Sequence, residues 1–139
     1  MSFKESVRYC LKNYTQFDGR ATRSEFWWFY LFLVIVAFVA YIPGGILLLI
    51  GGAASGDDGS AIGTMFIILG VIWLILLAIV VIALYIPFLA AGSRRLHDRG
   101  MSGWFQLLLL VPCGSIVLLI FWVMEGTPGD NQYGPKPVS

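Results

Sequence analysis

Three long apolar segments constrain the fold of this chain more than any other feature. Residues 26–50 contain no charged side chain, and residues 62–91 and 104–123 contain none either. A helix of 25 residues is about 37 Å long, more than the roughly 30 Å hydrocarbon core of a bilayer. Only 12% of the 139 residues are charged and 58% are hydrophobic. The sequence therefore predicts an all-α integral membrane protein, a single membrane domain over 1–139 with three transmembrane helices.

The segment before the first apolar run has the pattern of a basic amphipathic helix. Over residues 2–14, one helical face carries apolar side chains, and the other carries a basic residue every fourth position, at Lys4, Arg8 and Lys12. Ser2 followed by Glu5 fits a capping box at its start. We expect an N-terminal interfacial helix with its apolar face among acyl chains. Packing of the same face against the protein's own helices is a compatible alternative.

Proline and glycine interrupt the apolar segments at two places. Pro43-Gly44-Gly45 is expected to kink or end the first helix, because proline removes a backbone donor. Pro112-Cys113-Gly114-Ser115 divides residues 104–123, for which the first interpretation is a kinked full span. The alternative is a re-entrant hairpin of two half-helices. Residues 125–139 are rich in turn formers and predict an irregular tail.

The basic residues are distributed unevenly between the two sides that three spans would create. Eight of the nine fall before residue 26 or between residues 91 and 104, and the loop at 51–61 carries Asp57 and Asp58 with no basic residue. Positive charge gathers on the cytoplasmic side of membrane proteins. This predicts a multi-pass protein of the bacterial inner membrane with a cytoplasmic N-terminus. Three spans then place the 125–139 tail outside the cytoplasm.

The densest polar stretch is the segment 94–104 between the second and third apolar runs. It contains the only histidine, His97, next to Asp98. Together with the charged residues just before the first span, it supplies the candidate contacts for lipid headgroups or a protein partner: Arg20, Arg23, Glu25, Arg94, Arg95, His97, Asp98 and Arg99. Glu25 and Asp98 are expected to neutralise part of this arginine cluster, because docking the helices brings them together.

Acid–base chemistry at His97 and Asp98 is one alternative function, that of a membrane-interface enzyme. Neighbours on a helix point about 100° apart, so Asp98 is better placed to pair with Arg94 or Arg95 than to orient His97. The sequence has no recognisable nucleophile motif, metal-ligand spacing, cofactor-binding loop or nucleic-acid motif. We therefore predict no catalytic residue, metal or cofactor.

A small-solute or ion transporter or channel is the second alternative. None of the three spans contains an ionisable acid or base of the kind that ion-coupled carriers use. Three spans enclose little volume, so a pore would require a homo-oligomer. The favoured interpretation is a non-enzymatic membrane component whose basic cytoplasmic face binds anionic lipid or a membrane-protein partner.

Three motifs occur in order along the chain: Phe17-x-Gly19-Arg20-x-x-Arg23-x-Glu25-Phe26-Trp27, Arg94-Arg95-Leu96-His97-Asp98-x-Gly100-x-Ser102-Gly103-Trp104, and Gly126-Thr127-x-Gly129-x-Asn131-x-Tyr133-Gly134-Pro135. This combination resembles the YhaH/YhaI type of bacterial inner-membrane protein, domain-of-unknown-function family 805. The resemblance covers nearly the whole chain from Phe17. It implies a small multi-pass protein of the cytoplasmic membrane, and it brings no established activity.

Overall fold

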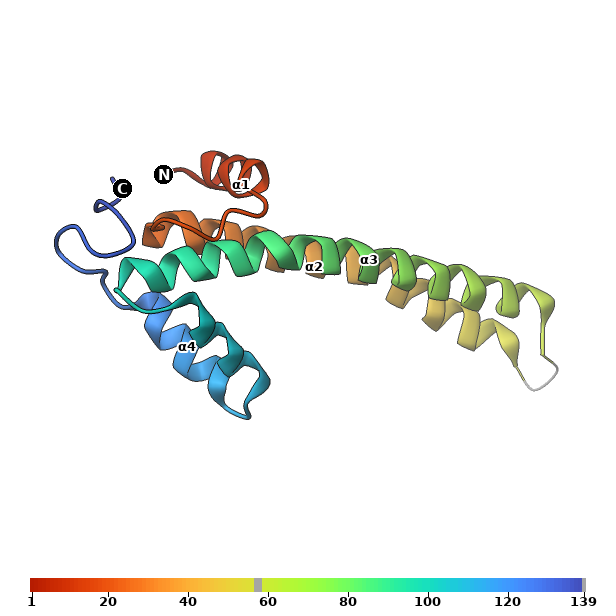
Figure 1. Cartoon of the computed structure of the whole chain (residues 1–139). Helices are drawn as coiled ribbons and strands as arrows, with labels where there is room; N and C mark the ends of the chain where they lie inside the picture. The colour runs from red at the N-terminus through yellow and green to blue at the C-terminus, as the bar shows by residue number, and fades with distance from the viewer. Residues whose placement is uncertain (57–58, 139) are drawn as a thin grey trace. The chain divides into compact units, whose positions relative to one another are not determined.

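The computed structural model describes residues 1–56 and 59–138, and its regular elements over these residues are helices (Figure 1). They are α1 (Phe3–Lys12), α2 (Arg23–Ser55), α3 (Ala61–Asp98), the 3₁₀-helix η1 (Gly103–Leu110) and α4 (Gly114–Val123). The chain forms two compact units, described separately below. The first comprises residues 1–32 and 85–139, and the second comprises residues 33–84.

Two of the helices, α2 and α3, are long and apolar enough to cross a membrane. Only 6% and 11% of their most apolar 18-residue windows are buried inside the protein. Large apolar side chains such as Phe38, Leu49 and Ile82 are 68–75% exposed. The core helix of a water-soluble protein would bury these side chains, whereas a lipid-facing helix exposes them. The predicted spans 26–50 and 62–91 lie within these two helices.

The second unit is held together by close contacts at glycine. A Cβ atom on Gly44 would lie 2.8 Å from the Trp73 ring, and one on Gly51 would lie 2.6 Å from Ile67. Small residues allow such close approach between apolar helices in lipid. The Trp73 indole also donates a 2.7 Å hydrogen bond to the Ala40 carbonyl. Trp73 therefore packs the helix pair.

Proline does not end either long helix. Pro43 lies inside α2, which continues to Ser55, and Pro87 lies inside α3. Of the two outcomes expected at Pro43, the end of the helix is therefore excluded. Gly44, the residue after Pro43, does not break the helix but allows its close contact with Trp73. The loop expected at 51–61 shortens accordingly, and its Asp57 and Asp58 lie outside the described residues.

The segment 104–123 is not one kinked helix. It forms η1 and α4, which pack against each other as a hairpin (Figure 1), with Phe105 and Phe121 rings 6.4 Å apart. Val111 is extended, and Cys113 adopts a left-handed conformation with φ of 64°. A left-handed residue after Pro112 reverses the chain and cannot continue a right-handed helix. The first interpretation of this segment was wrong, and the hairpin alternative describes its shape.

Helix α1 packs against the start of α2. Both halves of its capping box form between Ser2 and Glu5. Ser6 and Cys10 are buried, the Ser6 hydroxyl donates to the Glu25 carbonyl, and the Phe3 ring contacts Trp28 edge-on at 5.9 Å. This is the packing alternative for α1. Its outer face retains exposed Lys4, Arg8 and Lys12.

The C-terminal tail returns to the segment that ends α3. The Thr127 amide donates a 2.8 Å hydrogen bond to the Asp98 carbonyl, and Arg20 donates a 2.7 Å bond to the Gly129 carbonyl. Residues joined by hydrogen bonds cannot lie on opposite sides of a bilayer. The placement of the tail outside, away from Arg20 and Asp98, is therefore corrected. The hairpin explains the difference, because it does not carry the chain across.

This geometry predicts that both ends of the chain face the same compartment. A fluorescent protein and an alkaline phosphatase, fused in turn before Met1 and after Ser139, should give matching responses at the two ends. Phosphatase inserted between Ser55 and Ala61 should give the opposite response, since α2 and α3 are each long and apolar enough to cross the membrane once. Different responses at the two ends would show an odd number of crossings and contradict the hairpin.

Candidate functional site

A buried ionic cluster joins the N-terminal segment, the end of α3 and the tail. Its basic members, Arg20, Arg94 and Arg95, are each at most 9% exposed, and its acidic members, Glu25 and Asp98, are 4% and 6% exposed. The predicted neutralisation is confirmed. Glu25 pairs with Arg94, and Asp98 pairs with both Arg95 and Arg20, the last at 2.8 Å. Buried charges require such pairing because leaving one alone costs several kcal/mol, about 3–5.

Local sequence fixes where the helices that carry the cluster begin and end. The Thr22 hydroxyl accepts a 3.1 Å bond from the Glu25 amide and caps α2. The Glu25 carboxylate pairs with Arg94 and does not complete a capping box with Thr22. At the end of α3, Gly100 has φ of 73°, and the amides of Gly100 and Met101 donate to the carbonyls of His97 and Leu96. This is a Schellman motif, which favours glycine at that position because its backbone is left-handed.

Arg95 and Arg20 also hold backbone carbonyls. Arg95 donates to the carbonyls of Trp122 and Met124 at the end of α4, and to Ala21 at 3.3 Å. The last carbonyls of a helix have no partner inside it, so a cation there is stabilising. Arg20 donates to carbonyls of the tail at Thr127, Gly129 and Gly134. The two guanidinium groups therefore fasten α4 and the tail to α3.

Arg94 occupies a different environment under α1. One of its nitrogens pairs with Glu25, and the Tyr9 ring lies over the guanidinium at 5.4 Å. Its Nε and Nη2 have no hydrogen-bond partner among the described residues. An aromatic face above a desolvated guanidinium contributes a cation–π attraction. Helix α1 thus shields the Glu25–Arg94 pair from solvent.

His97 is held by backbone and tail, and Asp98 does not orient it. Its Nδ1 lies 3.0 Å from the Gly19 carbonyl, which can only accept, so Nδ1 carries a proton and points it at this carbonyl. Tyr133 stacks on the imidazole with ring centroids 3.9 Å apart. Because Asp98 is committed to Arg20 and Arg95, the two residues form no acid–base pair, as their adjacent positions indicated.

The remaining predicted contacts lie outside the buried cluster. The Arg23 side chain is 54% exposed and pairs at 3.3 Å with Glu125, which is 83% exposed. Arg99 is partly exposed, and its guanidinium lies 5.9 Å from the centre of the Phe121 ring. Of the eight predicted contact residues, the structure therefore brings five together in the buried cluster, places His97 beside it, and leaves Arg23 and Arg99 at the rim.

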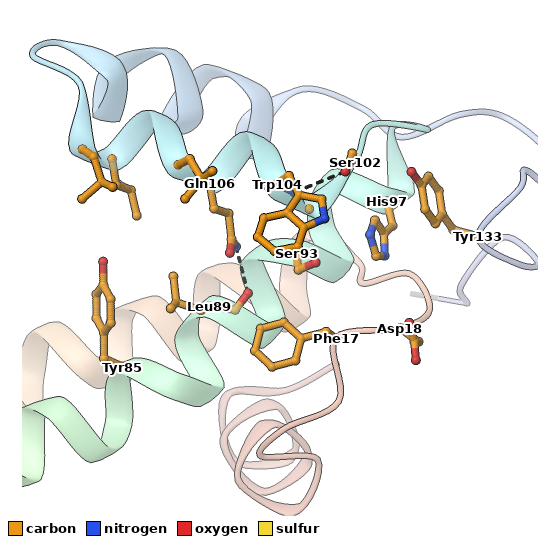
Figure 2. Close-up of a pocket in the computed structure, with 14 residues that line it drawn as sticks. Phe17, Asp18, Tyr85, Leu89, Ser93, His97, Ser102, Trp104, Gln106 and Tyr133 are labelled. Atoms are coloured by element: carbon orange, nitrogen blue, oxygen red, sulfur yellow. Dashed lines mark hydrogen bonds between the residues drawn. The ribbon is translucent and has the colours of Figure 1, made fainter.

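A cavity of about 690 Å³ borders the cluster between α3, η1, the 17–18 segment and Tyr133 (Figure 2). Its floor is one face of α3, formed by Tyr85, Leu89, Ser93 and His97. Its far wall is η1, and the Gln106 amide ties η1 to the Leu89 carbonyl at 2.8 Å. Apolar walls with a few convergent polar groups are typical of small-molecule sites.

Sequence reasoning missed the tail and Ser93 as parts of this region. Asn131 donates to the His97 carbonyl at 2.8 Å, and Tyr133 covers the imidazole. The glycines of the third sequence motif did indicate that the tail packs closely against another part of the protein. A Cβ atom on Gly126 would lie 1.9 Å from an Asp98 carboxylate oxygen, so only glycine fits there. The expectation of an external tail hid this contact.

The sequence profile of the family described as "Protein of unknown function (DUF805)" matches residues 14–135. The chain belongs to this family. It is 37% identical over 128 residues to "Inner membrane protein YhaH" of Escherichia coli (strain K12), which covers 91% of each chain. It is 38% identical over 128 residues to "Inner membrane protein YhaI" of the same strain, which covers 91% of this chain and 90% of that one. No solved structure is significantly similar. The resemblance seen in the three motifs is confirmed, and the two apolar helices agree with a membrane protein.

Removing one member of a buried ion pair should destabilise the protein strongly. We expect Glu25→Gln and Asp98→Asn each to lower the free energy of unfolding by about 3–5 kcal/mol, because an arginine is left unpaired in a buried site. Glu125→Gln is the matched control, since its exposed pair with Arg23 is worth about 0–1 kcal/mol. Thermal unfolding in detergent measures the difference. Equal melting temperatures for all three variants would contradict a buried cluster.

Cys10 should be unreactive while α1 is docked. Burial raises the pKa of the Cys10 thiol to about 11, so at pH 7 the thiol is protonated and is a poor nucleophile. In a Cys113→Ser background, N-ethylmaleimide at pH 7 should modify Cys10 only after unfolding, and the rate should rise with pH toward 11. Mass spectrometry of the intact protein counts the adducts. Fast modification of the folded protein at pH 7 would show that α1 is undocked.

Proposed function

We propose that this chain is a non-enzymatic component of the bacterial inner membrane that binds anionic phospholipid on its cytoplasmic face. The inner-membrane location is supported by the names of the two relatives. The orientation is supported by charge. All nine basic residues belong to segments 1–32 and 94–138, and the α2–α3 connection contributes only Asp57 and Asp58. The positive-inside rule then gives a cytoplasmic N-terminus and, with the tail beside it, a cytoplasmic C-terminus.

The surface that binds anionic lipid must be formed by basic side chains that are not already paired inside the protein. Arg20, Arg94 and Arg95 are buried in internal pairs, so they are not free to contact headgroups. The observation that carries the proposal is the exposed stripe of Lys4, Arg8 and Lys12 on α1. Apolar Phe3 and Leu11 are 37% and 38% exposed on the same helix. Exposed cations beside exposed apolar side chains suit the headgroup region of a membrane.

Native mass spectrometry of the protein from native membranes tests the stripe. A juxtamembrane cation contributes about 1 kcal/mol near an anionic surface, so Lys4→Gln with Lys12→Gln should weaken anionic lipid retention by about 30-fold. The control is Lys136→Gln, which removes an exposed charge from the tail of the same unit. The control should retain lipid. Equal retention by both variants would leave a protein partner as the better use of α1.

A further inference from the structure

The cavity described above changes character along its length. Tyr85, Leu89, Ser93 and His97 are spaced four residues apart on α3, so they form one stripe about 18 Å long. Figure 2 shows Tyr85 at one end of this stripe and His97 at the other. One leaflet of a bilayer has about 15 Å of hydrocarbon, half of the core. The stripe is therefore about as long as the hydrocarbon of one leaflet is deep, with Ser93 and His97 together at one end and the single hydroxyl of Tyr85 at the other.

The facing wall provides a matching apolar surface. In a 3₁₀-helix every third residue falls in line, which aligns Trp104, Leu107 and Leu110 along η1. These residues line the cavity, and they are 56–83% exposed within the protein. A wall of this kind contacts a chain inside the cavity and lipid outside it. An acyl chain can therefore enter the cavity between these side chains.

The polar end offers hydrogen-bond acceptors and hydroxyl groups. In the neutral imidazole the His97 Nε2 is the acceptor, because Nδ1 donates to the Gly19 carbonyl, and the Asp18 carboxylate accepts as well. A Cβ atom on Gly103 would lie 2.0 Å from the Ser93 hydroxyl oxygen and 3.4 Å from His97 Nε2, so these two polar atoms flank the same spot. No lysine or arginine lines the cavity among the described residues. This end suits a headgroup with O–H donors and disfavours phosphate.

We propose that this cavity binds the acyl chain of an uncharged, hydroxyl-bearing lipid of the monoacylglycerol or diacylglycerol class. The chain lies between Leu89 and Leu107, and the glycerol hydroxyls reach Ser93 and His97. A volume of about 690 Å³ is within the range of ligand-binding pockets. This site is separate from the α1 stripe. The two differ in the charge of the headgroup that each accepts.

Photo-crosslinking of the full chain in detergent tests the site. The probe is a monoacylglycerol with a diazirine in mid-chain, and crosslinked peptides are identified by mass spectrometry. We expect labelling of residues 85–97 and 103–110. Unlabelled monoacylglycerol should compete at a concentration at least tenfold lower than lysophosphatidylglycerol with the same acyl chain, because only the latter brings a phosphate. Equal competition by the two would overturn the assignment of an uncharged headgroup.

Paired variants separate the cavity from the general lipid surface. Leu89→Trp fills the cavity and should reduce labelling at least tenfold, and Leu107→Trp fills it from the other wall. Ile82→Trp, on an exposed face of α3 outside the cavity, should leave labelling unchanged. Ser93→Ala should weaken competition by monoacylglycerol severalfold, whereas Ser115→Ala should not. Labelling of both filled variants at the wild-type level would refute the site.

The outcome is independent of the α1 proposal. Lys4→Gln with Lys12→Gln should leave crosslinking unchanged, since neither residue lines the cavity. Loss of crosslinking in that variant alone would mean that the probe reports on α1 and would overturn the cavity assignment. Loss of anionic lipid with intact crosslinking would support both sites. Thus either proposal can fail while the other stands.

Discussion

The Asp98 carboxylate is the group on which the first unit depends. The carboxylate pairs with Arg95 from its own helix and with Arg20 from the segment before α2. The backbone carbonyl of the same residue accepts a hydrogen bond from the Thr127 amide in the tail. Three parts of the chain that are far apart in sequence therefore meet at one residue. Both guanidinium groups depend on this one carboxylate, because a charge left unpaired in a buried site is strongly destabilising. Docking of the tail and docking of the N-terminal segment are thus linked through one residue.

The cluster carries a charge that carboxylates do not fully balance. Three arginines face two carboxylates, which leaves one positive charge in a buried site. Backbone carbonyls supply the rest of the compensation, because Arg20 and Arg95 together donate seven hydrogen bonds to them. Most of these carbonyls belong to α4 and the tail. The irregular tail is therefore ordered by its main chain, which offers oxygen atoms in a shape that a regular helix cannot offer.

Much of the fold could be predicted from the sequence, and the part that could not has a physical reason. Apolar length identified α2 and α3, and charge pairing identified Glu25 and Asp98 as partners of arginine. The hairpin could not be decided, because Pro112 is compatible with a kink or with a reversal. The left-handed backbone at Cys113 decides it, and a non-glycine residue gives little warning of that conformation. Because residues 104–123 were predicted to cross the membrane, the tail was predicted to lie on the side opposite Arg20 and Asp98. Asn131 and Tyr133 were therefore left out of the candidate site.

The same pairing that stabilises the unit restricts where function can reside. Side chains that looked like headgroup contacts in the sequence, above all Arg94 and Arg95, are engaged within the protein, so their loss would first disturb folding. Two surfaces lie next to the cluster but do not use its charged side chains, so they remain available for binding. They are the outer face of α1 above Arg94 and the cavity beside His97. The imidazole ring of His97 shows both situations, because part of it is held by the protein and part is not. Its Nδ1 is fixed by Gly19 and its face by Tyr133, and Nε2 remains free of these contacts. A binding group held in this way is already oriented before a ligand arrives, which lowers the entropy lost on binding.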